Sequence, residues 1–294
     1  MCIFILEWVF FLIALRWISG LCFELYDMKK ALSRKSNINK YNRGWALITA
    51  STDGIGLGFA EELAKKGFNI IQVSRNPTKM QDIARRLKIN YLVDVINIKF
   101  DFQGALQNPI KNYLAIYEEI KDFDISIIIN NIGSTSVGFL KSQEALIMQN
   151  SLNLWPITML TRLILPILQR REKGGGIINI SSISSVKSLA LKGMALYAAG
   201  KAYGKAMSYI LDIESNSKVD ILCLTPGWVD TPLTKPFGNK RNRLITPNEL
   251  ACEALKQLGN VTCSFGHHNH WLGYYETQFV VLKNHIKNIF YYKS

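Results

Sequence analysis

Two side chains in this sequence have the types and the spacing that general acid catalysis requires. Tyr197 and Lys201 are four residues apart, so they share one face if the segment is helical. A phenol is a weak acid with a pKa near 10, and a neighbouring ammonium group lowers that pKa by favouring the phenolate. We therefore predict that Tyr197 donates a proton to a substrate and that Lys201 lowers its pKa.

A glycine-rich turn lies well upstream of this pair. It runs from Thr49 to Gly56, after an apolar run and before the helical pattern Gly58–Gly67. A strand, turn and helix in this order direct backbone N–H groups and the positive end of the helix dipole at a phosphate. We expect a dinucleotide here, with contacts from Thr49, Ser51, Asp53, Gly54, Ile55 and Gly56.

The end of the next apolar run indicates which dinucleotide is bound. The sequence there is Ser74-Arg75-Asn76. A site that selects NAD usually has a carboxylate at this point, which binds the ribose 2′-hydroxyl group, whereas an arginine suits a 2′-phosphate. Arg75 therefore predicts NADP(H) as the cofactor.

Short apolar runs alternate with helical patterns from Trp45 onward, which predicts βαβ units and a parallel sheet covered on both faces. With 294 residues, 48% of them hydrophobic, the chain is long enough for one large α/β domain. We place this catalytic domain at residues 44–260, and at 261–294 a C-terminal segment that contacts membrane or a partner subunit. The predicted strands are Trp45–Ala50, Asn69–Ser74, Ile96–Phe100, Ile125–Asn130, Ile177–Ile180 and Ile221–Thr225.

Residues 1–28 are largely apolar and are expected to anchor the chain in a membrane, as a span or as a monotopic helix. The stretch from Cys2 to Phe23 has the length of a span, which needs roughly 20 apolar residues, although Glu7 and Arg16 interrupt it. A buried amphipathic helix and a secretory signal are the alternatives. Residues 29–43 are basic and are predicted to be a linker, which by the positive-inside tendency leaves the domain in the cytosol.

The net charge of the chain is +13, but no nucleic-acid-binding motif accompanies it. We therefore expect no nucleic acid as a partner and attribute the charge to contact with anionic lipid or with anionic substrates. The five cysteines have neither metal-ligand nor disulfide spacing, which favours reduced thiols. The histidines of His267–His270 have no cysteine or carboxylate pattern beside them, and we predict no metal site.

Taken in order, these motifs make the chain resemble the short-chain dehydrogenase/reductase family over roughly residues 44–260. It is most similar to the membrane-bound branch that contains 17β-hydroxysteroid dehydrogenases and very-long-chain 3-oxoacyl-CoA reductases. The stretches Thr52–Gly56, Ala60–Ala64 and Ser74–Asn76 and the apolar N-terminus carry this likeness. It implies a doubly wound, Rossmann-type sheet and a location at the endoplasmic reticulum membrane, and we expect a homo-oligomer.

The resemblance also implies cofactor contacts beyond the glycine-rich turn. Asp101, after the third strand, would contact the adenine, and Asn130 begins an Asn-Asn-x-Gly element that lies behind the cofactor in the family. A later segment matches the element that covers the nicotinamide, and its contacting positions are Pro226, Val229 and Thr231.

A serine hydroxyl group is expected to hold the substrate oxygen, and two serines compete for this role. The family's usual spacing, thirteen residues before the tyrosine, selects Ser184. Ser182 instead lies at the end of a strand, and because the sheet fixes strand ends while loops absorb insertions, we favour Ser182. The family's fourth residue, an asparagine that positions a relay water, corresponds to Asn153, with Asn150 as the alternative.

These residues together predict an NADPH-dependent reductase that converts a ketone of a lipid, either a long-chain 3-oxoacyl-CoA or a steroid, to a secondary alcohol. Cations in the loop Thr231–Asn248 would meet coenzyme A phosphates, lipid headgroups or only solvent; they are Lys235, Lys240, Arg241 and Arg243. The alternative is a catalytically weak, dinucleotide-binding scaffold at the membrane. It is suggested by Ala50, which stands where the family has glycine, because a positive φ there would strain an alanine and weaken cofactor binding.

Overall fold

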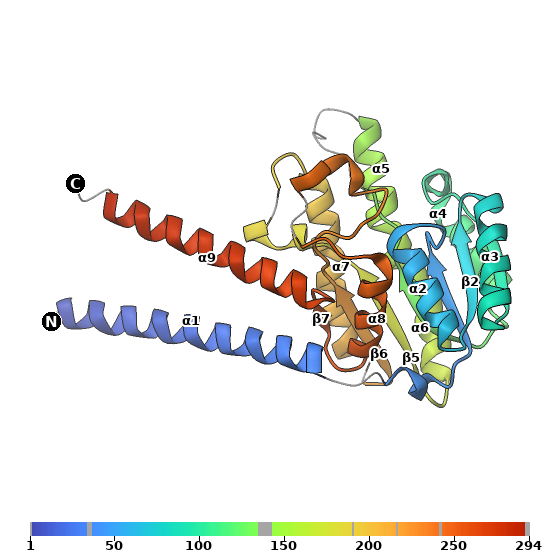
Figure 1. The fold of residues 1–294 in the computed structure, drawn as a ribbon, viewed down its shortest axis with the longest axis horizontal. Coiled ribbons are helices and arrows are strands. Elements are labelled where there is room, and N and C mark those ends of the chain that lie inside the picture. Colours follow the sequence, from blue (N-terminus) through green and yellow to red (C-terminus); the bar gives the residue numbers. More distant parts are fainter. Residues whose placement is uncertain are drawn as a thin grey trace.

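The computed structural model of this chain describes residues 2–33, 37–134, 143–189, 191–215, 217–240 and 243–291. Its centre is a seven-stranded parallel sheet with helices on both faces (Figure 1). The strands are β1 Trp45–Thr49, β2 Asn69–Ser74, β3 Val95–Lys99, β4 Ile125–Asn130, β5 Gly175–Ile180, β6 Val219–Leu224 and β7 Cys263–Ser264. The α-helices are α1 Cys2–Ser33, α2 Gly54–Lys65, α3 Pro77–Tyr91, α4 Pro109–Ile120, α5 Gln143–Asn153, α6 Trp155–Arg170, α7 Ala195–Glu214, α8 Pro247–Gln257 and α9 His268–Tyr291.

The order of the strands is β3-β2-β1-β4-β5-β6-β7, so the domain starts in the middle of the sheet and crosses over between β3 and β4. The carboxyl ends of β1 and β4 are therefore neighbours at the point where the order reverses. In open parallel sheets, ligands bind in the crevice outside the strand ends at this point. The arrangement confirms the predicted doubly wound parallel sheet.

The sheet separates two hydrophobic cores, because successive strand residues face opposite sides. Ile48 of β1 packs with Phe59 of α2 and Leu255 of α8, whereas its neighbour Leu47 packs in the core that contains α4 and α6. Complete burial of such a side chain contributes roughly 1.5–3 kcal/mol. Burial on both faces explains why the strands are near-continuous apolar runs.

Two parts of the structure differ from the sequence predictions. The strand β7 was not expected, because two residues are too few to give a periodic pattern; it pairs with β6 through Cys223 and Cys263. The segment 29–43 also differs from the predicted linker. Helix α1 continues to Ser33, and Tyr41 is fully buried, with its hydroxyl group donating a hydrogen bond of 2.7 Å to Asp220.

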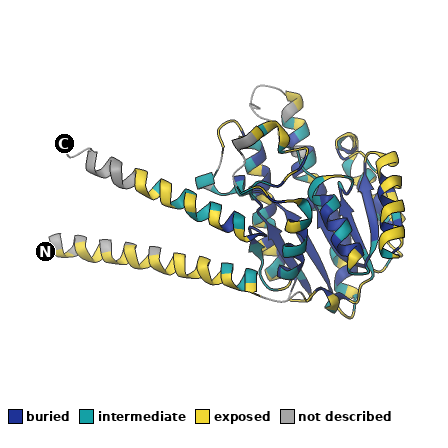
Figure 2. Ribbon diagram, in the orientation of Figure 1, coloured by how far each residue is buried: buried dark blue, intermediate teal, exposed yellow. Residues whose placement is uncertain are grey.

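Helices α1 and α9 both extend from the same side of the domain, and most of the described surface of α1 is exposed (Figures 1 and 2). At 1.5 Å per residue, the 32 residues of α1 measure roughly 48 Å, against roughly 30 Å for the hydrocarbon core of a bilayer. The segment Glu7–Ser33 is long and apolar enough to cross a membrane, and its apolar 18-residue window is not buried in the protein, although Ala31 near its end is. A second such segment, Leu146–Arg170, is more than half buried and belongs to the core.

Candidate active site

Two cavities share a wall at the carboxyl ends of the strands. The first, here called the sheet-edge cavity, has a volume of about 310 Å³ and lies between the turn after β1, the end of β5 and the segment after β6. The second, the α9 cavity, has a volume of about 390 Å³ and lies beside the first turns of α9. Ser182 and Tyr197 line both cavities, as do Gly227, Leu233 and Thr234. Whatever binds in one cavity is therefore close to the occupant of the other at this shared wall, where Ser182 and Tyr197 offer a hydroxyl group and a phenol.

The turn after β1 has the backbone expected of a phosphate-binding loop. Ala50 has a φ of 50°, Gly54 has a φ of 50°, and Asp53 caps α2 by accepting a hydrogen bond of 2.8 Å from the N–H group of Gly54. A Cβ atom on Gly56 would lie 2.3 Å from the carbonyl oxygen of Ala50, so only glycine allows α2 to start this close to the turn.

The residues that line the sheet-edge cavity fit a dinucleotide. The cavity extends from the turn and the N-terminus of α2, where a phosphate is favoured, to Tyr197 and Lys201 on α7. Glycines keep its walls open: a Cβ atom on Gly54 would lie 3.0 Å from Thr231, and one on Gly133 would lie 2.8 Å from the Nζ atom of Lys201. Of the predicted cofactor contacts, the lining residues are Asp53, Gly54, Ile55, Tyr197, Lys201, Pro226, Val229 and Thr231.

Three other predicted contacts are buried behind this cavity and bind protein groups. Thr49 Oγ1 accepts hydrogen bonds from the N–H groups of Asn131 and Ile132, at 2.9 and 3.0 Å. Ser51 donates to Gln72, and the amide of Asn130 donates to the side chain of Asn179 at 2.8 Å. These three residues join β1 and β4 to their neighbours, and so fix the floor of the cavity.

Arg75 and Asp101 lie at the carboxyl ends of β2 and β3, at the same edge of the sheet as the turn after β1. Both side chains are exposed. Asp101 accepts a hydrogen bond of 3.1 Å from the N–H group of Gln103. Beside Arg75, Asn76 caps α3 through the N–H group of Lys79, at 3.0 Å, which fixes the backbone that carries the guanidinium group.

The hydroxyl group of Ser182 lies beside the phenol of Tyr197 in the wall of both cavities. Burial raises the pKa of Tyr197, and the Ser182 hydroxyl group opposes the rise. The effect of burial is opposite in direction to the lowering that we predicted from Lys201. Ser184 also lines the α9 cavity, and its backbone N–H group donates to Ser182 Oγ at 3.1 Å. Ser182, rather than Ser184, is thus the serine that acts on the pKa of the phenol, and the choice of the serine that holds the substrate oxygen stays a prediction.

Lys201 lines the sheet-edge cavity together with Tyr197. Its Nζ atom is 5.8 Å from the centre of the Tyr197 ring and donates a hydrogen bond of 2.8 Å to the carbonyl oxygen of Ile180. Burial lowers the pKa of Lys201 to about 8. The ammonium form is therefore the main form at neutral pH and is lost at mildly alkaline pH.

Asn153 lies across Gly133 from Lys201. A Cβ atom on Gly133 would lie 3.1 Å from Asn153 Oδ1 and 2.8 Å from Lys201 Nζ, so the amide and the ammonium group flank this glycine. The Asn153 amide donates to Gln149 Oε1 at 2.7 Å and to the carbonyl oxygen of Ser134 at 3.1 Å. The structure thus places Asn153 near Gly133 and Lys201, and its role with a relay water stays a prediction. The side chain of its alternative, Asn150, lies outside the described residues.

The first turns of α9 contribute wall residues that the sequence analysis did not assign to the site. His270 is buried, and its two ring nitrogens face the carbonyl oxygens of Phe265, at 3.2 Å, and Trp228, at 3.1 Å. Arg243 forms an ion pair with Glu276, with 3.0 Å between Arg243 Nε and Glu276 Oε2. Arg243 is thus not a free cation, and Arg241 lies outside the described residues.

Comparison with known proteins identifies the family. A family model described as short chain dehydrogenase matches residues 44–242. The human protein named "Inactive hydroxysteroid dehydrogenase-like protein 1" is 32% identical over 269 residues, which cover 87% of this chain and 78% of that protein. A zebrafish protein (Danio rerio) named very-long-chain 3-oxoacyl-CoA reductase-B is 31% identical over 246 residues, covering 81% of this chain and 75% of the relative.

Solved structures have the same fold. A 7β-hydroxysteroid dehydrogenase superposes with a TM-score of 0.73 at 22% identity, covering 82% of this chain and 94% of that one. The L-sorbose reductase of Gluconobacter frateurii, solved with NADPH and L-sorbose, has a TM-score of 0.63 at 26% identity, covering 76% and 95%. The NADPH complex of the sorbose reductase supports the prediction of NADP(H) as the cofactor. The chain belongs to the short chain dehydrogenase family of oxidoreductases, in agreement with the resemblance seen in its motifs.

Proposed function

We propose that this chain is an NADPH-dependent ketoreductase that acts on a lipid ketone, either a long-chain 3-oxoacyl thioester or a steroid. The observation that carries the proposal is the position of Ser182 and Tyr197 in the wall between the sheet-edge cavity and the α9 cavity. A cofactor in the first cavity and a ketone in the second would meet at this wall, which Gly227, Leu233 and Thr234 also line. A hydroxyl group and a phenol there can bind a carbonyl oxygen and give it a proton.

The sheet-edge cavity would hold NADPH, which supplies the hydride. The N-terminus of α2 and the turn that contains Gly54 would bind its phosphates, because unpaired N–H groups and the helix dipole favour negative charge there. Arg75 is exposed at the end of β2, where a guanidinium group can pair with a 2′-phosphate. Lys201 would orient the nicotinamide end, at the bottom of the cavity.

Proton delivery would belong to Tyr197. Burial raises the pKa of the phenol, so it carries its proton at neutral pH and can donate it to the developing alkoxide. Ser182 would donate a hydrogen bond to the same oxygen, which fixes the carbonyl group and stabilises the negative charge that forms on it. The ammonium group of Lys201 would favour the phenolate that remains after the transfer.

Support for a lipid substrate comes from the lining of the α9 cavity and from the relatives. Apolar side chains form much of its wall; they are Leu189, Leu191, Met194, Trp228, Leu233 and Phe237. Several of the similar curated proteins carry the name very-long-chain 3-oxoacyl-CoA reductase. Coenzyme A phosphates are one of three alternatives for the four loop cations; one of the four, Arg243, is paired with Glu276, which weakens the argument for steering by that loop.

The proposal is tested with full-length protein in detergent micelles. NADPH absorbance is followed after addition of a long-chain 3-oxoacyl-CoA or a ketosteroid, and the alcohol is identified by mass spectrometry. We expect alcohol in equal amount to the NADPH consumed, and none above background with Tyr197→Phe. Absence of alcohol with every lipid ketone, while NADPH still binds, would reject the proposal.

For the location, we propose attachment to the endoplasmic reticulum membrane through α1, with the catalytic domain in the cytosol. The support is the exposed apolar surface of α1, including Trp8, Phe11 and Leu15. Deletion of residues 1–28 should release the protein from membranes, whereas high salt should not. Full-length protein found wholly in the soluble fraction would contradict this proposal.

A second candidate function is a dinucleotide-binding scaffold with little catalytic activity. Ala50 favours it, since a positive φ is uncommon for a residue with a Cβ atom and marks a departure in the cofactor turn. One similar human protein is named inactive. The same assay separates the two functions, because a scaffold binds NADPH without forming alcohol.

A further inference from the structure

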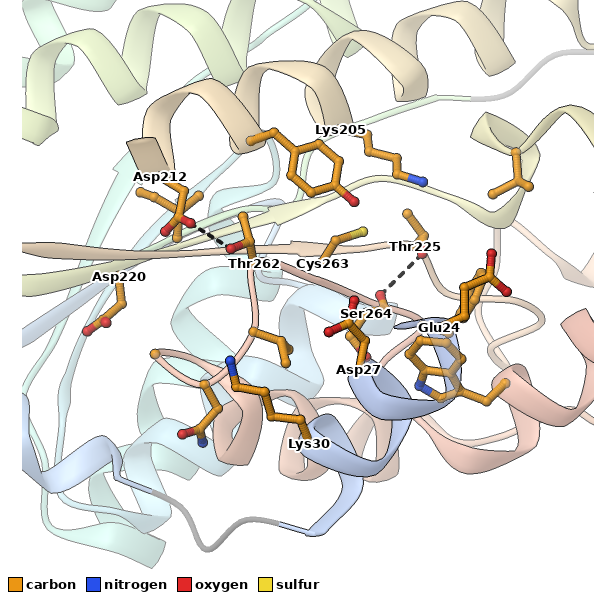
Figure 3. A pocket seen from close by; sticks show the side chains of 18 of the residues that line it. Glu24, Asp27, Lys30, Lys205, Asp212, Asp220, Thr225, Thr262, Cys263 and Ser264 are labelled. Atoms are coloured by element: carbon orange, nitrogen blue, oxygen red, sulfur yellow. Dashed lines mark hydrogen bonds between the residues drawn. The ribbon is translucent and has the colours of Figure 1, made fainter. Parts of the chain in front are cut away.

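A third cavity lies apart from the two that form the candidate active site. It has a volume of about 590 Å³ and is enclosed by α1, α7, the edge of the sheet at β6 and β7, and the start of α9. Figure 3 shows the side chains of Lys205, Cys263 and Asp27 around it, from α7, β7 and α1. We call it the α1 cavity. None of the residues assigned to hydride or proton transfer lines it.

Two cysteines are neighbours beside the α1 cavity, and one of them, Cys263, lines it. Cys223 of β6 and Cys263 of β7 are partners in the parallel register, and the N–H group of Cys223 donates to the carbonyl oxygen of Thr262 at 2.8 Å. Adjacent strands lie roughly 4.7–4.9 Å apart, within the range of Cα separations, roughly 4.4–6.8 Å, that a disulfide spans. Cys223 is fully buried, whereas Cys263 is partly exposed and lines the cavity.

The surroundings of Cys263 stabilise a thiolate. Lys205, Tyr209 and Thr225 line the α1 cavity together with Cys263, and Cys223 is its partner on the neighbouring strand. The interaction with Cys223, with smaller contributions from Lys205, Tyr209 and Thr225, lowers the pKa of Cys263 although burial opposes it. The same interaction raises the pKa of Cys223. One cysteine of the pair is thus the nucleophile, and the other stays protonated.

We propose that Cys263 and Cys223 form a peroxide-reactive dithiol site, with Cys263 as the attacking residue and Cys223 as the resolving residue. The Cys263 thiolate attacks the terminal oxygen of a hydroperoxide, the O–O bond breaks, and water or an alcohol leaves with one proton. Cys263 is then a sulfenic acid. Cys223 attacks that sulfur, the S–O bond breaks, water leaves, and a disulfide forms. Both thiols are oxidised by two electrons in total, and the hydroperoxide is reduced by two.

The site shares three features with reactive rather than structural cysteines: Cys263 is partly exposed, it lines a cavity with the cation Lys205, and a second cysteine is its strand partner. The cavity lining also carries carboxylates, which are Glu24, Asp27, Asp212 and Asp220. Buried unpaired thiols, by contrast, are inert. Among the cysteines whose side chains the structure describes, Cys22 is exposed on α1 and Cys252 lies on α8, and no register pairs either of them with another cysteine. Cys252, which is partly exposed like Cys263, is therefore the matched control.

Peptide mapping tests the proposal on the full-length protein in detergent micelles. The protein is exposed to hydrogen peroxide, its remaining thiols are blocked with N-ethylmaleimide, and non-reduced peptides are analysed by mass spectrometry. We expect a peptide that joins Cys223 to Cys263, loss of alkylation at both, and reversal by a dithiol reductant. Cys252→Ser should leave the linkage intact and Cys263→Ser should abolish it. In Cys223→Ala, Cys263 should instead be trapped as a sulfenic acid by dimedone.

Two results would overturn the proposal without reliance on any variant. One is wild-type protein in which both cysteines remain alkylated after peroxide treatment to the same extent as before. The other is an alkylation rate of Cys263 by iodoacetamide whose pH midpoint equals that of an ordinary thiol, about 8.5, instead of lying below it. Neither measurement depends on ketone reduction. The dithiol proposal can therefore be rejected or supported whether or not the chain is a ketoreductase.

Discussion

The hydroxyl group of Ser182 lies beside the phenol of Tyr197 in the wall of both cavities, although Ser182 follows strand β5 and Tyr197 lies in the first turn of α7. The contact joins the end of β5, whose position is fixed by the sheet, to α7, which carries Tyr197 and Lys201 on one face. It opposes the effect of burial on the phenol, which raises the pKa of Tyr197. A carbonyl oxygen that binds between these two groups would be held by one and protonated by the other.

Replacement of Ser182 tests the role of this contact. Ser182→Ala should lower kcat by roughly 10²–10³-fold, the usual effect of removing one donor to a developing oxyanion. Ser184→Ala should be mild, because the group that Ser184 offers to Ser182 is its backbone N–H, which the substitution retains. Steady-state rates of ketone reduction by both variants measure this. A larger loss in Ser184→Ala than in Ser182→Ala would mean that Ser184 holds the substrate oxygen.

The pKa of Lys201 predicts how the reaction depends on pH. Burial lowers this pKa to about 8, so the ammonium group is present below pH 8 and is lost as the pH rises through that value. Because kcat/KM reports the groups of the free enzyme, kcat/KM for ketone reduction should fall above pH 8. The raised pKa of Tyr197 means that the proton donor itself is not lost in this range. A rate that stays level into strongly alkaline solution would contradict this role of Lys201.

Ala50 has a positive φ in the protein alone, so any backbone strain there is present before a cofactor binds. Strain that is the same with and without the cofactor lowers the free energy of unfolding, but it cancels from the binding free energy of NADPH. Ala50→Gly should therefore raise the free energy of unfolding by up to about 1 kcal/mol and leave the Kd for NADPH unchanged. Denaturant unfolding and an NADPH titration measure the two quantities.

Leu92 offers a matched control for this prediction. It has a φ of 56° at the end of α3 and is 91% exposed. Leu92→Gly should also raise stability without any change in NADPH binding. A clear tightening of NADPH binding in Ala50→Gly alone would mean that the alanine methyl group crowds the cofactor, as the sequence suggested, and it would strengthen the scaffold hypothesis.

Cofactor preference tests Arg75. A hydrogen bond to a charged group is worth roughly 1.5–3 kcal/mol, so the unaltered protein should prefer NADPH over NADH by roughly 10–100-fold in kcat/KM. Arg75→Asp should erase or reverse this preference, because a carboxylate repels the 2′-phosphate and accepts from a 2′-hydroxyl group. The same charge change at Arg85, an exposed residue of α3 that pairs with Asp82, should leave it intact. Equal use of both cofactors by the unaltered protein would exclude this role of Arg75.

Elements with strong local signals could be predicted from the sequence. The predicted bounds of Asn69–Ser74 and Ile125–Asn130 agree with β2 and β4, because strands buried on both faces are apolar throughout. The glycine-rich turn and Ser182 each follow a predicted strand, and parallel strands bring their carboxyl ends to one edge of the sheet. The sequence therefore predicted that these residues meet Tyr197 and Lys201 at one site, and part of the turn, Ser182, Tyr197 and Lys201 all line the sheet-edge cavity.

Features that depend on tertiary contacts could not be predicted in this way. Glu276 is 33 residues from Arg243 and is brought to it only by the packing of α9 beside the cavity. Counting residues left Ser182 and Ser184 as alternatives, since the contact with the phenol depends on how the chain turns after β5. Thr49, Ser51 and Asn130 carry polar groups at the right strand ends, but in the fold these groups bind neighbouring strands and loops.

Hydride transfer to a lipid ketone is the central claim, and an isotope experiment tests it most directly. Full-length protein is incubated with NADPH deuterated at the reactive nicotinamide carbon and with a long-chain 3-oxoacyl-CoA or a ketosteroid, and the alcohol is analysed by mass spectrometry. The account predicts one deuterium on the new carbinol carbon, with a rate lower by roughly 10²–10⁴-fold in Tyr197→Phe, the usual contribution of a general acid. Alcohol without deuterium, or no alcohol from protein that binds NADPH, would contradict it.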